Sequence, residues 1–212
     1  MLDDARKRAE ALGADIETHT IFSHRGFEEI FDAARTHEAD TVVMGWGPAS
    51  HGSPGRAESA LEEITTDVSA DFLVVRDRGF DPSQILVPTI GGPGSAYAAS
   101  VASLIQDEYE SEITLLHVAD SVSEGEAFLE EWAADQGLSN PTFQVETGDV
   151  NEEIVGAAED TSLVIVGASE RGLLTRLLRG SPAQQIVDSV DCSVILAEKH
   201  HDRSILEKIL GR

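Results

Sequence analysis

The sequence predicts an α/β protein with a doubly wound, five-stranded parallel sheet over residues 79–199. Apolar runs of strand length alternate there with amphipathic helical patterns, which is typical of parallel sheets whose crossover helices cover both faces. A glycine-containing loop, residues 167–181, leads from the fourth apolar run into a helical pattern. Part of the same order recurs upstream, so the chain also predicts a second, incomplete unit at its N-terminus.

Each element of the C-terminal unit follows from its own pattern. Five runs rich in Val, Ile and Leu have the length of buried strands and are separated by turn-forming residues. These strands are expected at residues 84–88, 113–118, 142–146, 163–166 and 192–197. Helices are expected at residues 95–109, 124–135, 151–159 and 182–190, the first of them after a Gly/Pro loop at 91–94. Ser181 suits the N-cap of the last helix, and Pro182 suits its first position.

The first 77 residues repeat part of this plan. Residues 28–45 and 152–167 both pair an amphipathic helix with a strand that ends in glycine. The other elements expected upstream are helices at 3–12 and 57–68 and strands at 16–21 and 71–75. This copy lacks the first strand, first helix and second strand of the plan. We therefore divide the chain into an incomplete unit (1–78), a complete unit (79–199) and a helical tail (200–212).

The incomplete copy leaves the strand at 16–21 without a hydrogen-bonded neighbour, and unpaired buried backbone is costly. Three explanations are open: the missing strands lie upstream in a longer polypeptide, another chain supplies them, or the half-unit is reshaped. We favour the first. The tail either docks on another domain or chain or packs on its own unit.

The charge of the chain is extreme. Its formal net charge is −24, with 39 acidic residues against 15 lysines and arginines. Such a surface indicates a cytoplasmic protein of a salt-accumulating microbe, where salt screens self-repulsion; an ordinary acidic protein is the alternative. The charge argues against nucleic-acid binding. No run of 18 apolar residues is present, so we expect no membrane insertion.

Catalytic and metal-binding patterns are weak. The seven histidines are scattered and show no helical His-x3-His spacing, so no metal site is expected. The single cysteine, Cys192, opens a strand and reads as a small buried apolar residue. No nucleophile, acid or base constellation stands out, so we do not expect an efficient enzyme.

The order of strand, glycine loop and helix is one that holds phosphates, because exposed N–H groups at a helix start attract anions. Here Gly167 and Gly180-Ser181 take the outer positions of a Gly-x2-Gly-x9-Gly-Ser/Thr loop. Together with the strands at 85–88 and 115–118 and the ending 191–196, this loop resembles that of the universal stress protein family, in tandem form.

This resemblance implies an ATP or AMP site in the complete unit, with Mg²⁺ only alongside ATP. The most that such a site would do as an enzyme is slow ATP hydrolysis. Residues near the base and sugar would be Thr89, Gly91 and Val118. Residues near the phosphates would be Gly167, Ser169, Gly180 and Ser181. The incomplete unit has Glu58 where the loop needs its last glycine, so no nucleotide is expected there.

Three departures from the family loop bear on this site. Ile90 stands in the run after the first strand where the family has an aspartate. Glu170 replaces the inner glycine of the loop. Pro182 lacks the backbone N–H that would donate to a phosphate. A desolvated carboxylate beside phosphates is repulsive. Nearby arginines either compensate or form a solvated face: Arg171, Arg176 and Arg179.

The resemblance implies a regulatory module that senses an adenine nucleotide; the alternative is an interaction or dimerisation domain without a ligand. Edge-to-edge pairing of the final strands, 72–75 with 194–197, is expected within one chain or between two. The loop at 87–93 looks like those of tandem modules appended to amino-acid permeases and sodium/proton antiporters of salt-loving archaea. A transporter domain at the cytosolic face of a membrane is thus an expected partner.

Overall fold

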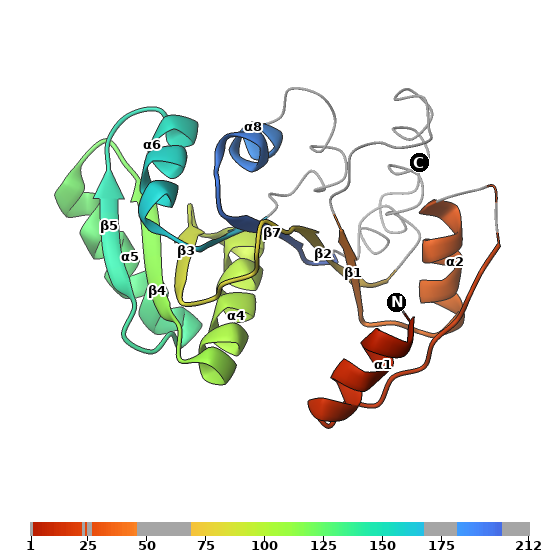
Figure 1. The fold of residues 1–212 in the computed structure, drawn as a ribbon. Coiled ribbons are helices and arrows are strands. Elements are labelled where there is room, and N and C mark those ends of the chain that lie inside the picture. Colours follow the sequence, from red (N-terminus) through yellow and green to blue (C-terminus); the bar gives the residue numbers. More distant parts are fainter. Residues whose placement is uncertain (1, 23, 25–26, 46–68, 168–181, 201–212) are drawn as a thin grey trace, which may run out of the picture.

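The computed structural model describes residues 2–22, 24, 27–45, 69–167 and 182–200. Within them, seven strands form one sheet in the order β1-β2-β7-β6-β3-β4-β5 (Figure 1). Their bounds are Thr41–Gly45 (β1), Asp71–Arg76 (β2), Gln84–Pro88 (β3), Glu112–Val118 (β4), Thr142–Glu146 (β5), Leu163–Gly167 (β6) and Ser193–Glu198 (β7). All neighbours are parallel except β2 and β7. The parallel set β7-β6-β3-β4-β5 confirms the predicted α/β fold class.

Helices cover both faces of the parallel set. Their bounds are Leu2–Ala11 (α1), Phe27–Thr36 (α2), Gly92–Tyr109 (α4), Val122–Gln136 (α5), Val150–Ala157 (α6) and Pro182–Ser189 (α8), with a 3-10 turn at Ala158–Asp160. One core cluster joins α4 and α5 to the sheet, and a second joins α6 and α8 to the other face. A smaller cluster packs α2 on β1 and β2. None of the described helices has both the length and the apolar character needed to cross a membrane.

Two expectations for the chain path were wrong. Residues 14–22 form no strand, and the side chains of Ile16 and Ile21 are 40% and 54% exposed. The alternating pattern there has no described strand to pair with, so it yields an extended coil. Of the expected loop at 91–94, residues 92–94 instead form the start of α4, because Pro93 fits the first helical turn, and Gly91 is the N-cap residue. The expected helix at 57–68 and the tail from 201 onward lie outside the described residues.

The two final strands pair within the chain. Register places Phe72 opposite Glu198 and Arg76 opposite Val194 in an antiparallel ladder. At one end, the Asp71 carboxylate accepts a hydrogen bond from the His200 backbone N–H, at 2.8 Å. At the other end, the Arg78 backbone N–H donates to Ser193 Oγ at 3.0 Å. The β2–β7 pairing is the seam that joins β1 and β2 to the parallel sheet. It stays a prediction that residues 1–78 are an incomplete copy of the unit at 79–199.

Candidate functional site

The candidate site lies where the strand order reverses. Strand β3 is flanked by β4 on one side and β6 on the other. Because these strands are parallel, their carboxyl ends bring Thr89, Val118 and Gly167 to one edge of the sheet. Open α/β sheets bind ligands at this switch point. Four of the predicted residues, Gly91 included, therefore occupy one edge.

The turn after β3 is built around Thr89, which is 3% exposed. Its backbone N–H donates to the Leu116 carbonyl at 2.8 Å, and its Oγ1 accepts from the Gly91 N–H at 3.1 Å. Gly91 and Gly92 have φ values of 76° and 83°, which L-residues seldom adopt. A Cβ at Gly92 would have no atom within 4 Å, so the space beside Gly92 is open, whereas a Cβ at Gly91 would lie 3.4 Å from the Phe128 ring.

Helix α4 starts in this turn without a side-chain cap. Gly91 is its N-cap residue and offers no side chain to the first turn. The early N–H groups of a helix lack intrahelical partners and carry the positive end of the helix dipole. This 18-residue helix therefore directs a favourable field at an anion placed near Gly92.

His117 and Phe128 lie beside the turn after β3, and sequence reasoning missed their contacts there. The His117 Nδ1–H donates to the Thr89 carbonyl at 2.8 Å, since a carbonyl can only accept. The imidazole lies over the Phe128 ring, with centroids 4.3 Å apart and planes tilted by 35°. The one available signal was that His117 stands at the end of an apolar strand; nothing in the sequence ties it to Phe128.

The phosphate side is described only in part. Gly167 ends β6 against the start of α4: a Cβ there would lie 2.2 Å from the Gly94 carbonyl oxygen. Helix α8 begins at Pro182, as predicted. The remaining predicted residues lie outside the described part of the chain: Ser169, Gly180 and Ser181. The same holds for Glu170 and the loop arginines, Arg171, Arg176 and Arg179.

A cavity lies beside β4 and β5, and its lining residue Glu146 is opposite Val118 at the same edge. It has a volume of about 360 Å³ and is bounded by α6, β4 and β5. Three of its lining residues carry carboxylates: Glu146, Glu153 and Asp160. Clustered carboxylates repel phosphate, so this cavity does not compete as the nucleotide site.

A mixed histidine and carboxylate group lies in the N-terminal part. Among the described residues, Glu17, His19 and His37 form the group whose ligand atoms all come within 4.8 Å of one another. All three are exposed. No pattern in the sequence predicts this grouping, because the two histidines belong to different segments.

Comparisons with known proteins agree with this architecture. The model of the universal stress protein family matches residues 123–198. A universal stress protein from Archaeoglobus fulgidus DSM 4304 is 16% identical, with a TM-score of 0.66 over 96% of this chain and 76% of that one. A protein from Pseudomonas aeruginosa UCBPP-PA14, described as a candidate universal stress protein, is 18% identical, with a TM-score of 0.62 over 100% and 82%.

A third structure of this fold is the cytoplasmic domain of a prokaryotic cation chloride cotransporter. It is 12% identical, with a TM-score of 0.59 over 93% of this chain and 80% of that one. At these identities the structural likenesses establish the fold alone. The search among curated proteins found no match.

Proposed function

Because the chain belongs to the universal stress protein family through the domain that contains residues 123–198, we propose that its C-terminal unit is a regulatory module that binds an adenine nucleotide. The base and sugar lie near Thr89, Gly91 and Val118 at the ends of β3 and β4. The phosphates lie toward Gly167, which packs against the first turn of α4, and toward the loop that carries Ser169, Gly180 and Ser181. ATP would bring Mg²⁺ with it; AMP would not need it.

The observation that carries this proposal is the start of α4 at the switch point. Gly91 provides no side-chain cap, and the space beyond Gly92 is open. An anion there would accept from the Gly94 N–H, a donor that an N-cap side chain otherwise bonds, whereas Pro93 in the same turn has no N–H to donate. The bound phosphate thus replaces a missing cap, in a sheet position where ligands of this fold class bind.

Thermal unfolding and calorimetry with ATP, AMP and cyclic AMP test the proposal, in buffer that contains molar KCl. Gly92→Leu should abolish the nucleotide-dependent rise in Tm, because the new side chain fills the open space. Gly79→Leu is its matched control: Gly79 also has a positive φ, 92°, and nothing within 4 Å of its Cβ position, but it lies in the turn after β2. Absence of heat and of a Tm rise with every nucleotide at millimolar concentration would refute nucleotide binding.

An interaction module without a ligand is the second candidate, and two observations favour it. His117 already occupies the Thr89 carbonyl, and Ile90 is 70% exposed where the family has an aspartate. If the wild-type chain binds no nucleotide, the double variant Ile90→Asp/Glu170→Gly should create binding. A double variant that stays inert would mean that the site is closed by more than these two side chains.

The resemblance also supports a role beside a transporter. A cotransporter domain with this fold exists, so the architecture is compatible with attachment to a membrane protein at its cytosolic face. In this proposal the nucleotide alters the surface that the module presents to the transporter. Reading-frame context, that is, transmembrane segments encoded next to this module, is the direct check.

A further inference from the structure

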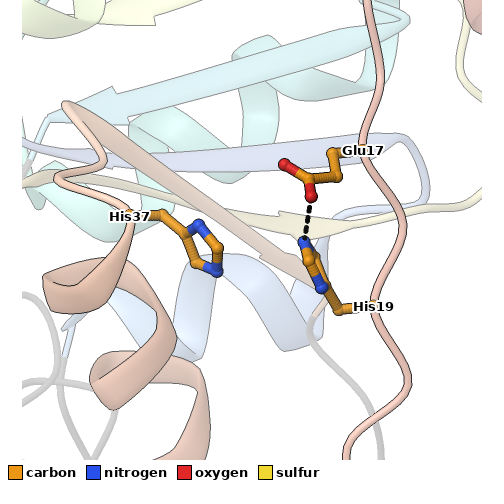
Figure 2. Close-up of side chains that lie close together, drawn as sticks. All are labelled: Glu17, His19 and His37. Carbon is orange, nitrogen blue, oxygen red and sulfur yellow. Dashed lines mark ion pairs between the residues drawn. The ribbon is translucent and has the colours of Figure 1, made fainter.

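The N-terminal part brings two imidazoles and a carboxylate together at its surface (Figure 2). Glu17 Oε1 lies 3.3 Å from His19 Nε2. The rings of His19 and His37 have centroids 5.0 Å apart. The ligand atoms of all three residues fall within 4.8 Å of one another. Two histidines and one carboxylate are a donor set that Zn²⁺ takes in proteins.

These distances suit a single ion. Zn–N and Zn–O bonds of roughly 2.0–2.1 Å in a tetrahedron separate neighbouring ligand atoms by about 3.3 Å. The Glu17–His19 pair already has that separation. The other separations exceed it by at most about 1.5 Å, the difference between 4.8 Å and 3.3 Å, which a side-chain rotation closes.

The backbone holds His37 in place. It follows α2, and the αL residue Glu38, with φ of 48°, ends the helix. The Glu38 N–H donates to the Arg35 carbonyl at 3.3 Å and the Ala39 N–H to the Ala34 carbonyl at 2.9 Å. This is the hydrogen-bond pattern of a Schellman cap. His37 therefore sits at the negative end of the helix dipole, which favours a cation.

Glu17 and His19 reach the same point from an extended segment. Residues two apart on an extended chain project to the same side, and the residue between them projects to the other. Thr18, the residue between them, accepts a hydrogen bond from the Arg6 guanidinium of α1. Glu17 and His19 project from this segment toward His37 (Figure 2).

We propose that Glu17, His19 and His37 bind a divalent ion with an affinity for nitrogen donors, Zn²⁺ in the first place, with water in the fourth position. The ion ties the coil at 14–22 to the end of α2. It thereby replaces the sheet hydrogen bonds that this segment lacks. Co²⁺, Ni²⁺ and Cu²⁺ suit the same donors, whereas Mg²⁺ and Ca²⁺ prefer all-oxygen sites.

Metal titration of the full chain tests this site, after chelator treatment and without nucleotide. Zn²⁺ affinity is measured by competition with a chromophoric chelator, and Co²⁺ ligation by its visible absorption. His19→Gln and His37→Gln should each weaken Zn²⁺ binding at least tenfold and remove the Co²⁺ band. Glu17→Gln should weaken binding less, because the amide oxygen still coordinates. Mg²⁺ should have no effect.

His24→Gln is the matched control, since His24 is an exposed histidine of the same region. It should bind Zn²⁺ as the wild type does. Hydrogen exchange provides the second readout: Zn²⁺ should slow exchange of the amides in 14–22 in wild type and His24→Gln, but not in His37→Gln. Wild-type affinity in both His19→Gln and His37→Gln, or an equal loss in His24→Gln, would overturn the proposal.

Discussion

Gly167 lies so close to Gly94 that a Cβ at position 167 would come within 2.2 Å of the Gly94 carbonyl oxygen. The contact joins the end of β6 to the first turn of α4. It requires a glycine at 167 whether or not a nucleotide binds. The first glycine of the predicted phosphate loop is therefore needed for the packing of strand against helix.

Gly167→Ala should destabilise the chain by about 2–3 kcal/mol, because backbone must move to admit the methyl group. Urea unfolding measures the loss. Gly156→Ala is the matched control: Gly156 is an exposed α6 residue with nothing within 4 Å, so alanine there should stabilise by about 0.5–1 kcal/mol. If Gly167→Ala and the wild type have the same free energy of unfolding, the space between β6 and α4 admits a methyl group, which contradicts the close contact of Gly167 with Gly94.

The seam between β2 and β7 predicts how separated halves behave. Residues 1–78 should be unfolded alone, because the two strands and the buried cluster of five residues that the structure describes in this span make too small a core. Residues 79–212 should fold and leave the β7 edge unpaired. Circular dichroism of both fragments checks this difference.

The freed β7 edge should pair with a second copy, so the mass of fragment 79–212 in solution should rise toward a dimer with concentration. A synthetic peptide of residues 69–78, which contains β2, should compete and restore a monomeric fragment with one bound peptide. A fragment that stays monomeric and does not bind the peptide would contradict a seam held by strand pairing.

Much of the fold could be predicted because its signals are local. The run 163–166 was expected as a strand, and β6 spans Leu163–Gly167. The strand expected at 16–21 is absent because strand formation depends on a non-local contact. Alternating apolar and polar residues favour an extended backbone, but a strand also needs a neighbouring strand to bond with. Periodicity carries no information on that partner.

Some residues of the candidate site could also be predicted from the sequence, and some contacts could not. The family resemblance implied that Thr89, Val118 and Gly167 share one site, and the parallel strands do end with these residues at one edge of the sheet. The contact of His117 with Thr89 and Phe128 depends on how α5 packs on β4. The meeting of His19 with His37 depends on a helix cap and on the path of a coil. Neither leaves a pattern in the sequence.

Cys192 should react slowly with alkylating agents. Burial raises the pKa of its thiol above the ordinary value, outweighing the opposing hydrogen bond to Thr161. A raised pKa leaves less thiolate at a given pH, and the thiolate is the nucleophile. The iodoacetamide rate, followed by intact mass between pH 7 and 10, should have its midpoint above that of the urea-unfolded chain. A midpoint at or below the unfolded value would contradict this environment.

The net charge of −24 should make stability depend on salt. The Debye length falls from roughly 10 Å at 0.1 M to about 3 Å at 1 M, so KCl should raise Tm by weakening self-repulsion. Helix α5 gives a local test, because Glu126 and Glu130 are exposed and one helical turn apart. Glu130→Lys converts this repulsion into attraction and should stabilise by about 0.5 kcal/mol at low salt, with a smaller gain in 2 M KCl. Glu130→Gln should lie between the two. A gain that is the same at both salt concentrations would trace the effect to helix propensity instead of charge.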